Sequence, residues 1–487
     1  MTLPSREKFS MRNPKSVALA LLCALISMAS CVEAQTFTTL GNFVGFNGTA
    51  PFFGNMVQAR NGNYYGATTW GGANGLGAIF ELISTGKLNS ISTYSFCSLP
   101  GCADGAYPEQ APILSSDGNL YGVTVGGGSS NAGGTIYKMT VSGKLTTLYS
   151  FCQTLPCSDG FGPTGLMLAS NKNFYGVTGN GGAYNVGTFF EITSTGEFRV
   201  LHSFCNQPGC TTGSGPAASP IEAINGNFYG TTESGGFHGG GVVYEITPGG
   251  SYKALYNFCS QANCADGNHP EASLVQDANG NLYGTTIYGG AYGNGAVFEI
   301  TPSDQFIVLH SFSGNGTDGE FPQSSVTLAN DGNLYGTTTN GNDNFGNIYQ
   351  ISPDGTYTSF NPFCNTSVCS GYDAAYGLLQ GTDGVFYGAT ADGGTHGGGV
   401  VYSFSNNLTP LAKTVPVAGK VGTRVIILGN GLTGATSVTF NGVPATFTVN
   451  ANTYITATVP AGATTGTVSV VTPSGTLNSN PQFLVTK

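Results

Sequence analysis

Charged side chains are scarce in this sequence. Asp, Glu, Lys and Arg make up 8% of its 487 residues, whereas a soluble domain contains about 25%. Basic residues are the scarcest, because 15 Lys and Arg stand against 25 Asp and Glu and leave a formal net charge of −10. Phosphate backbones and anionic lipids are bound through basic patches. The composition therefore argues against nucleic acid and anionic membranes as partners.

Helix-forming composition is lacking as well. The chain has 76 Gly, roughly twice the usual share, and each Gly inside a helix costs about 1 kcal/mol. Aromatic residues reach 11% and hydrophobic residues 40%, which favours strands and a packed core rather than a disordered linker. These proportions predict an all-β protein.

Long apolar runs are confined to the N-terminus. Residues 17–29 are apolar, too short a stretch to span a bilayer, and four basic residues precede them. This pattern predicts a signal peptide over residues 1–34, cleaved after Ala34. As an alternative, residues 28–31 resemble a lipobox, in which Cys31 would be lipidated. No later segment is apolar enough to span a membrane, so we expect no transmembrane segment after signal removal.

Cysteines follow one spacing. Two of the 12 lie in the signal region, and the other ten form five pairs, each with four residues between its members. In an exported chain this pattern indicates disulfides. A zinc site would need four converging ligands, whereas each pair stands alone in its own repeat. The expected disulfides are Cys97–Cys102, Cys152–Cys157, Cys205–Cys210, Cys259–Cys264 and Cys364–Cys369.

A repeat centred on Asn/Asp-Gly-Asn-aromatic-Tyr-Gly dominates the chain. Its Tyr residues recur 52 to 56 residues apart, at positions 65, 121, 175, 229, 283, 335 and 387. Units of this length suit four-stranded propeller blades better than leucine-rich or ankyrin repeats, whose units are shorter. Seven copies therefore predict a seven-bladed β-propeller.

The fifth copy shows how one unit divides into strands. Residues 272–277, 281–286, 296–301 and 306–312 alternate apolar and polar side chains or follow an Asn-Gly turn. We name these predicted strands A, B, C and D, in chain order.

The two ends of the repeat region predict how the ring closes. The last copy lacks a strand D, while residues 36–43 match the strand D pattern and precede the first copy. We expect residues 36–43 to pair with residues 399–405, which would remove the free sheet edges.

Composition changes after residue 408. The repeat and the cysteines stop, and Val- and Thr-rich segments begin at 421–428, 437–440, 445–449, 454–459, 466–471 and 482–485. This density of short strands predicts a small immunoglobulin-like sandwich. The expected domains are the propeller at 35–408 and the sandwich at 409–487.

Two family resemblances follow from these motifs. The run NLYGTT–GG–GxGxVFEITPxG–LxSF resembles the GloVer tandem repeat of bacterial exported proteins over roughly residues 36–405. That resemblance implies export but carries over no catalytic residue. Gly429-Asn-Gly431, Asn441-Gly442 and Val459-Pro460 resemble an IPT/TIG domain. The second resemblance implies an immunoglobulin-like module of the kind found in surface proteins and carbohydrate-active enzymes.

Candidate binding residues lie in the D–A and B–C connections, which open on one face of a propeller. Asp precedes Gly in four D–A connections, and His238 and His396 occupy equivalent B–C positions. The competing interpretation makes each Asp a turn residue and each His a loop filler. Since the two His belong to different blades, we expect no shared metal site and no cofactor. The four Asp are Asp104, Asp159, Asp266 and Asp318.

Other repeated positions favour structural roles. His202 and His310 lie in strand D, and the repeated Tyr is expected in blade packing. Polar residues at one strand A position either line the channel or form hydrogen bonds. They are Gln58, Glu222, Gln276 and Gln380.

No catalytic motif stands out: the sequence has no Gly-x-Ser-x-Gly, no His-Glu-x-x-His and no P-loop. The leading hypothesis is a monomeric, non-catalytic, exported binding protein of the bacterial envelope that recognises glycans or envelope proteins. One alternative is a polysaccharide hydrolase or lyase, for which Glu233 and Glu320 break the repeat. A second alternative is a structural surface protein.

Overall fold

The computed structural model is built from strands. Three short 3₁₀ turns are the only helical elements among the described residues: η1 (Pro100–Cys102), η2 (Pro208–Cys210) and η3 (Ala262–Cys264). None of the residues described here forms a helix long and apolar enough to cross a membrane. The signal peptide prediction and Cys31 fall outside the described residues. These are 35–51, 54–89, 92–129, 133–316, 318–341, 345–360, 363 and 371–486.

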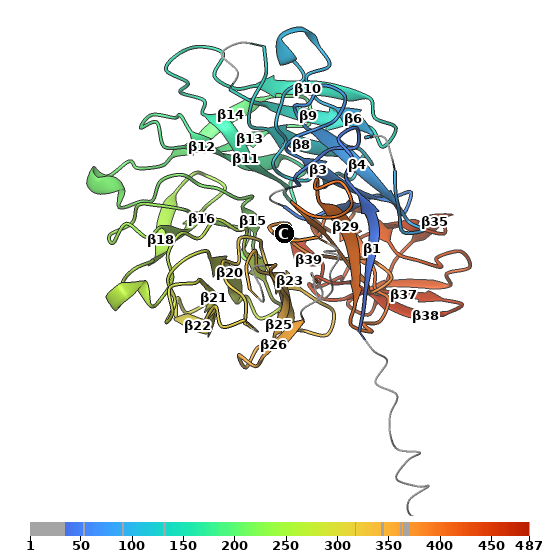
Figure 1. Ribbon diagram of the computed structural model, residues 1–487. Helices are drawn as coiled ribbons and strands as arrows, with labels where there is room; N and C mark the ends of the chain where they lie inside the picture. Colours follow the sequence, from blue (N-terminus) through green and yellow to red (C-terminus); the bar gives the residue numbers. More distant parts are fainter. Residues whose placement is uncertain are drawn as a thin grey trace, which may run out of the picture.

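Seven sheets, one for each copy of the repeat, surround a common centre (Figure 1). Each is antiparallel, and its strands run from the centre outwards in the order A to D. The first three are β2 (Val57–Gln58), β3 (Tyr64–Thr68), β4 (Ala78–Ile83), β5 (Lys87–Leu88) and β6 (Tyr94–Ser95); β7 (Ile113–Leu114), β8 (Leu120–Thr124), β9 (Thr135–Met139) and β10 (Leu145–Ser150); and β11 (Phe161–Leu168), β12 (Phe174–Asn180), β13 (Thr188–Ile192) and β14 (Phe198–Ser203).

The remaining sheets follow the same plan. They are β15 (Ile221–Glu222), β16 (Phe228–Thr232), β17 (Val242–Ile246) and β18 (Tyr252–Asn257); β19 (Val275–Gln276), β20 (Leu282–Thr286), β21 (Ala296–Ile300) and β22 (Phe306–Ser311); β23 (Thr327–Leu328), β24 (Leu334–Thr337), β25 (Ile348–Ile351) and β26 (Tyr357–Phe360); and β27 (Leu379–Gln380), β28 (Phe386–Thr390), β29 (Val400–Ser405) and β1 (Thr36–Asn42). The all-β propeller fold predicted from the repeat is confirmed.

Strand A is shorter than the alternation predicted. In the fifth copy only Val275 and Gln276 pair with β20, although residues 272–277 were expected to do so. The inner strands converge on the channel, and six of the seven pair over two residues. β11, with 8 residues, is the exception.

The N-terminal strand closes the ring, as predicted. β1 runs antiparallel to β29, from Thr36 opposite Ser405 to Asn42 opposite Val400. Phe37 adds side-chain contacts, with its ring centroid 5.0 Å from that of Tyr402. The first described strand therefore completes the last blade.

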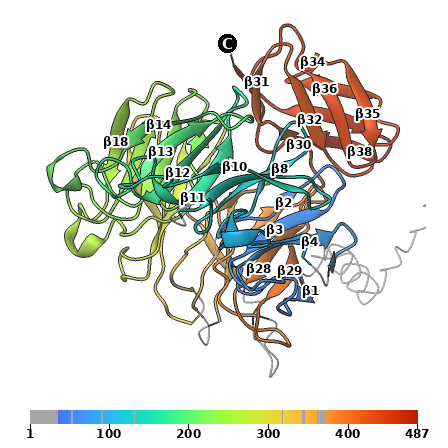
Figure 2. The same ribbon diagram turned by 90° about the horizontal axis from the view of Figure 1, so that it is seen from above.

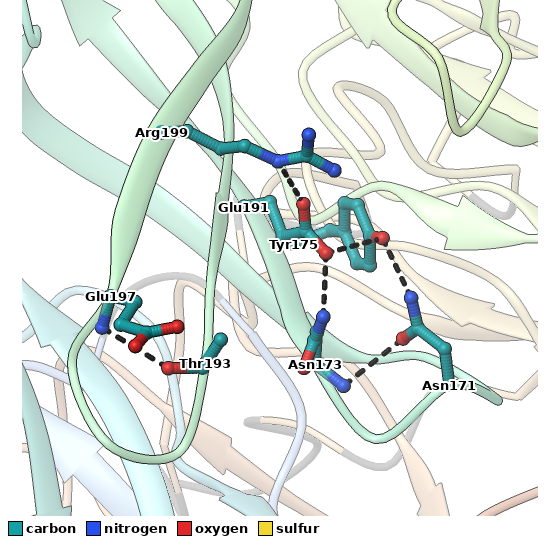
Figure 3. A network of polar contacts seen from close by, with 7 residues as sticks. All are labelled: Asn171, Asn173, Tyr175, Glu191, Thr193, Glu197 and Arg199. Atoms are coloured by element: carbon teal, nitrogen blue, oxygen red, sulfur yellow. Dashed lines mark hydrogen bonds and ion pairs between the residues drawn. The ribbon is translucent and has the colours of Figure 1, made fainter.

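The repeat motif builds a partly buried polar network at one end of each blade. In the third blade the Asn171 side chain donates to the Tyr175 hydroxyl (2.9 Å), and both Tyr175 (2.9 Å) and Asn173 (2.6 Å) donate to Glu191 (Figure 3). Arg199 pairs with the second Glu191 oxygen. The motif residues are therefore scaffold, as expected for the repeated Tyr.

In six of the seven blades, one carboxylate accepts the hydrogen bond that the motif Tyr hydroxyl donates. Where the motif begins with Asn, strand C places Glu opposite the Tyr, as in Asn171 and Glu191. Where it begins with Asp, strand C places Lys138, Gln350 or Ser403 there. The fifth blade departs from this rule, because Tyr283 lies near both Asp277 and Glu299.

The motif Gly is required by the neighbouring strand. A Cβ at Gly230 would lie within about 2.4 Å of the Tyr244 hydroxyl. Since strand C carries an aromatic ring at this point, any side chain would overpack the blade.

The polar strand A residues join neighbouring blades. Glu222 accepts from the backbone N–H of Ser170 (2.7 Å), and Gln276 accepts from that of Ile224 (2.8 Å). Gln58 bonds the hydroxyl of Thr382 (3.0 Å) and so links the first blade to the last. Of the two interpretations offered by the sequence, hydrogen bonding describes this position.

We call the end of the propeller with the A–B and C–D turns the turn face, and the opposite end the loop face. The loop face comprises the B–C connections 69–77, 125–134, 181–187, 233–241, 287–295, 338–347 and 391–399, and the D–A connections 43–56, 96–112, 151–160, 204–220, 258–274, 312–326 and 361–378, where described.

The C-terminal residues form a sandwich, as expected. Its strands are β30 (Lys413–Val415), β32 (Arg424–Leu428), β36 (Tyr454–Thr458) and β35 (Phe447–Ala451) in one sheet, β34 (Val443–Pro444), β33 (Ser437–Phe440), β37 (Val468–Thr472) and β38 (Gly475–Asn478) in the second, and the parallel pair β31 (Ala418–Lys420) and β39 (Leu484–Thr486).

The sandwich packs on the turn face (Figure 2). Ile426 and Leu428 join the apolar core between the first two blades, which includes Ala59 and Leu114. The Thr453 hydroxyl donates to the carbonyl oxygen of Arg60 at 2.6 Å. The loop face is left uncovered.

Candidate functional site

Four predicted disulfides are formed in the D–A connections. They are Cys97–Cys102, Cys152–Cys157, Cys205–Cys210 and Cys259–Cys264. Cys364 and Cys369 lie outside the described residues. All eight bonded Cys have left-handed backbone, with φ between 52° and 61°. Each bridge therefore closes a tight loop at the rim of the loop face.

A buried Asp holds the disulfide loop by accepting hydrogen bonds from it, and we call it the bracing Asp. Asp104 accepts from the Tyr94 hydroxyl (2.7 Å) and from the backbone N–H groups of Ser98 (2.9 Å) and Leu99 (3.1 Å). Asp266 repeats this arrangement with Tyr256 and Ser260. Burial raises the pKa of Asp104, but the hydrogen bonds from Tyr94 and Ser98 outweigh it and hold the pKa below its usual value.

The brace does not depend on the disulfide. Asp159 accepts from the Tyr149 hydroxyl (2.8 Å) in a disulfide loop, whereas Asp318 accepts from the Ser313 N–H (2.6 Å) and pairs with His310 in a loop without Cys. These contacts match the turn interpretation of the four Asp. Ligand contact by Asp104, Asp159, Asp266 and Asp318 remains a prediction.

His238 and His396 project from B–C connections of the fourth and seventh blades, where both are exposed. His396 contacts the neighbouring Thr395 hydroxyl at 2.8 Å. Among the described residues, no three His, Cys, Asp or Glu are grouped so that they could hold a metal ion. Their role in binding remains a prediction.

Exposed aromatic rings gather on the loop face, and the sequence analysis did not single them out. Seven aromatic side chains expose between 38% and 72% of their surface, and all seven belong to its connections. Five lie in B–C and two in D–A connections. They are Phe46, Trp70, Tyr184, Phe237, Tyr288, Tyr292 and Tyr372. Large exposed aromatic side chains on one face are candidate contact residues of an interaction site.

Six partly buried carboxylates accompany these rings. Burial, reinforced by the charge of Glu233, raises the pKa of Glu271 to about 7. Burial, reinforced by Asp392, also raises the pKa of Asp373. The six are Glu109, Glu233, Glu271, Glu320, Asp373 and Asp392.

Left-handed backbone recurs at the inner rim of the loop face, where each D–A connection reaches strand A; we call this rim the mouth. Seven equivalent residues have positive φ; six lie ahead of strand A, and Gly162 is the second residue of β11. Non-glycine residues pay about 1–2 kcal/mol for this conformation, and Tyr107, His269, Phe321 and Asp373 adopt it at 56° to 58°. The other three are Ala50, Gly162 and Gly215. The strain positions side chains at the mouth.

His202 offers a pH test of the strand D packing. It stacks on Tyr252, with centroids 4.7 Å apart, and its Nε2 has no partner among the described residues. Burial lowers its pKa from 6.5 to about 4. The unfolded chain therefore binds more protons between these values, and stability falls as pH decreases through this window.

We expect the wild type to lose on the order of 3 kcal/mol of unfolding free energy between pH 6.5 and about 4 through this group. His202→Phe should remove that part of the loss, which urea titrations across the window would measure. Parallel pH profiles for the two proteins would contradict the assignment.

A hollow lies between the sandwich and the turn face. It is a cleft of about 1510 Å³ lined by residues such as Gln276, Asn279, Asn330, Asn478 and Gln482. It contains none of the seven exposed aromatic residues.

Two solved structures are similar to this chain. A streptogramin B lyase is similar with a TM-score of 0.50 and 15% identity over 77% of this chain and 99% of that chain. PorZ, a surface component of the type-IX secretion system of Porphyromonas gingivalis, gives a TM-score of 0.49 and 15% identity over 91% of this chain and 61% of that chain. The likeness to the lyase concerns the fold alone. No curated protein matches the sequence.

Family profiles match most of the chain. The IPT/TIG domain matches residues 407–485. The Gloeobacter/Verrucomicrobia repeat matches residues 28–215 and 163–375, well over half of the sequence. The chain therefore belongs to the Gloeobacter/Verrucomicrobia repeat family and ends in an IPT/TIG domain.

Proposed function

We propose that this is an exported, non-catalytic binding protein of the bacterial envelope, which recognises glycans through its loop face. The observation that carries the proposal is the gathering of seven exposed aromatic rings on that face. Flat aromatic rings offer a large contact area to the apolar faces of sugar rings at a low entropy cost. The disulfides and the predicted signal peptide support export.

The IPT/TIG domain serves as an accessory module or spacer in this proposal. Its contacts with Arg60 and Leu328 place it on the turn face. It therefore leaves the loop face free for a long ligand.

A glycan array with residues 35–487 tests this proposal. For a glycan that binds, Trp70→Ala combined with Tyr292→Ala should weaken affinity at least about tenfold, since each lost ring contact is worth about 1 kcal/mol. The matched control is Ile307→Ala, which removes an exposed apolar side chain from outer strand β22 and should change affinity little. Equal affinity in all three proteins would refute the loop face as the site.

A polysaccharide hydrolase or lyase is the second candidate. It is favoured by Glu271, whose pKa of about 7 would suit a general acid, beside Glu233. Turnover of any polysaccharide that Glu271→Gln abolishes would establish this alternative and overturn the non-catalytic proposal.

A further inference from the structure

We propose that the loop face selects glycans that carry free amino groups and rejects polyanionic glycans. This inference rests on the proposed function and names the ligand class. Two features motivate it. Basic and acidic residues are distributed unevenly between the two ends of the propeller, and aromatic rings lie on the acidic end.

Every Lys and Arg of the propeller lies at the turn end. The seven occupy A–B turns, C–D turns or the adjoining ends of strands C and D. They are Arg60, Lys87, Lys138, Lys144, Lys172, Arg199 and Lys253. No connection of the loop face contains a Lys or Arg in the sequence.

The loop face has acidic residues but no Lys or Arg, so its formal charge is negative. Its described connections hold ten Asp and Glu: the four bracing Asp and the six partly buried carboxylates. The ion pairs of Lys and Arg in the described chain, such as Lys138–Asp117 (2.8 Å) and Lys253–Asp304 (2.7 Å), all lie at the turn end. A polyanion approaching the loop face would meet unbalanced like charge, whereas a polycation would be attracted.

Three aromatic side chains lie close together where the loop face meets the fifth and sixth blades, and two acidic residues neighbour them in the sequence. Tyr288 lies between His269 and Phe321, with ring centroids 5.6 Å and 5.7 Å away. Glu271 follows His269 by two residues, and Glu320 directly precedes Phe321. An ammonium group is stabilised both by aromatic faces and by carboxylates. In this proposal a sugar ring stacks on these aromatic side chains, and its amine pairs with the carboxylates of Glu271 and Glu320.

The backbone holds these partners in place. His269 and Phe321 both have left-handed φ, at 56° and 58°. The His269 N–H donates to Gly240 (3.0 Å), and the Phe321 N–H donates to Asn294 (2.9 Å). Each residue is thus fixed to the preceding blade, so binding would require little ordering of these loops.

The same geometry favours a glycan over a basic peptide. Extended peptides gain much of their affinity by pairing with a free sheet edge. The loop face consists of connections, and the open edges of the blades belong to outer strands such as β14, β18 and β22. Recognition at the loop face depends on side chains, which suits stacked sugar rings.

The test compares four polymers of similar length at neutral pH: β-1,4-linked glucosamine, its N-acetylated counterpart, a polyuronate and polylysine. We expect the glucosamine oligomer to bind at least about tenfold more tightly than the acetylated one, with no polyuronate binding and with affinity falling as salt is added. Glu271→Gln combined with Glu320→Gln should abolish this preference. The control pair, Glu197→Gln with Asp354→Asn, changes two exposed acids of C–D turns and should retain it.

Each other outcome has a definite meaning. Equal binding of both oligomers by the wild type would overturn the amine preference and leave the proposed glycan function standing. Binding of polylysine alone would overturn both in favour of a basic peptide partner. Binding of the polyuronate would overturn the charge argument. Loss of the preference in the control pair would show that it arises from overall charge rather than from the mouth.

Discussion

Deleting residues 36–42 is expected to destabilise the propeller by at least about 4 kcal/mol and to cause association of the unfolded or opened ring. The deletion removes the whole β1–β29 ladder and the contacts of Phe37 with Tyr402 and Phe363. It also leaves β29 as an open edge in the last blade. Urea unfolding followed by fluorescence measures the loss, and light scattering measures association.

Point substitutions separate the ladder from the packing. Phe37→Ala should cost about 2 kcal/mol, because it removes a partly buried aromatic ring that packs against the core of the last blade. Thr39→Ala, on an exposed position of the same strand, should stay within about 0.5 kcal/mol of the wild type. An unchanged unfolding midpoint in the deletion variant would show that the ring does not need this strand.

The second large effect is expected in the polar network of Figure 3. Asn171→Asp alone should destabilise the protein by about 2 kcal/mol, since it sets a second carboxylate beside Glu191 around one Tyr175 hydroxyl. The fifth blade shows the consequence of such a pair: burial and the neighbouring Asp277 raise the pKa of Glu299.

A double variant should recover much of that loss. Asn171→Asp with Glu191→Gln recreates the sixth blade, where Asp331 accepts from Asn333 (2.9 Å) and Tyr335 (2.9 Å) opposite Gln350. A double-mutant cycle in urea should give a coupling energy of about 2 kcal/mol. Additive effects of the two substitutions would refute the rule of one carboxylate per Tyr.

The repeated features could be predicted from the sequence because each is local. Alternation and Asn-Gly turns located strands B, C and D in the fifth copy, and the missing last strand D predicted the pairing of β1 with β29. Strand A was overextended in the prediction, because its pairing depends on how the inner strands converge around the channel. In the sandwich, short strands such as β31 and β34 had no clear alternating pattern.

Side-chain direction in the connections could not be derived in the same way. Asp104 lies in the predicted connection, but it turns inward to the Tyr94 hydroxyl, since the direction depends on the left-handed backbone of the disulfide loop. The sequence does hold a signal for the exposed aromatic residues, because they depart from the repeat. Trp70, as the single Trp, and Tyr292 carry that signal, and comparing B–C connections for unmatched aromatic residues would have found them.

The position of the IPT/TIG domain on the turn face has a consequence for how an attached molecule would be oriented. Thr36 lies opposite Ser405 and hence at the turn end of the last blade. Both the start of the propeller and its C-terminal module thus lie on the same side of the ring. A lipid, a wall component or a partner subunit attached to the start of the propeller or to the C-terminal module would therefore hold the molecule on its turn face. The loop face, with its acidic and aromatic residues, would then point away from the attachment and stay accessible to ligands.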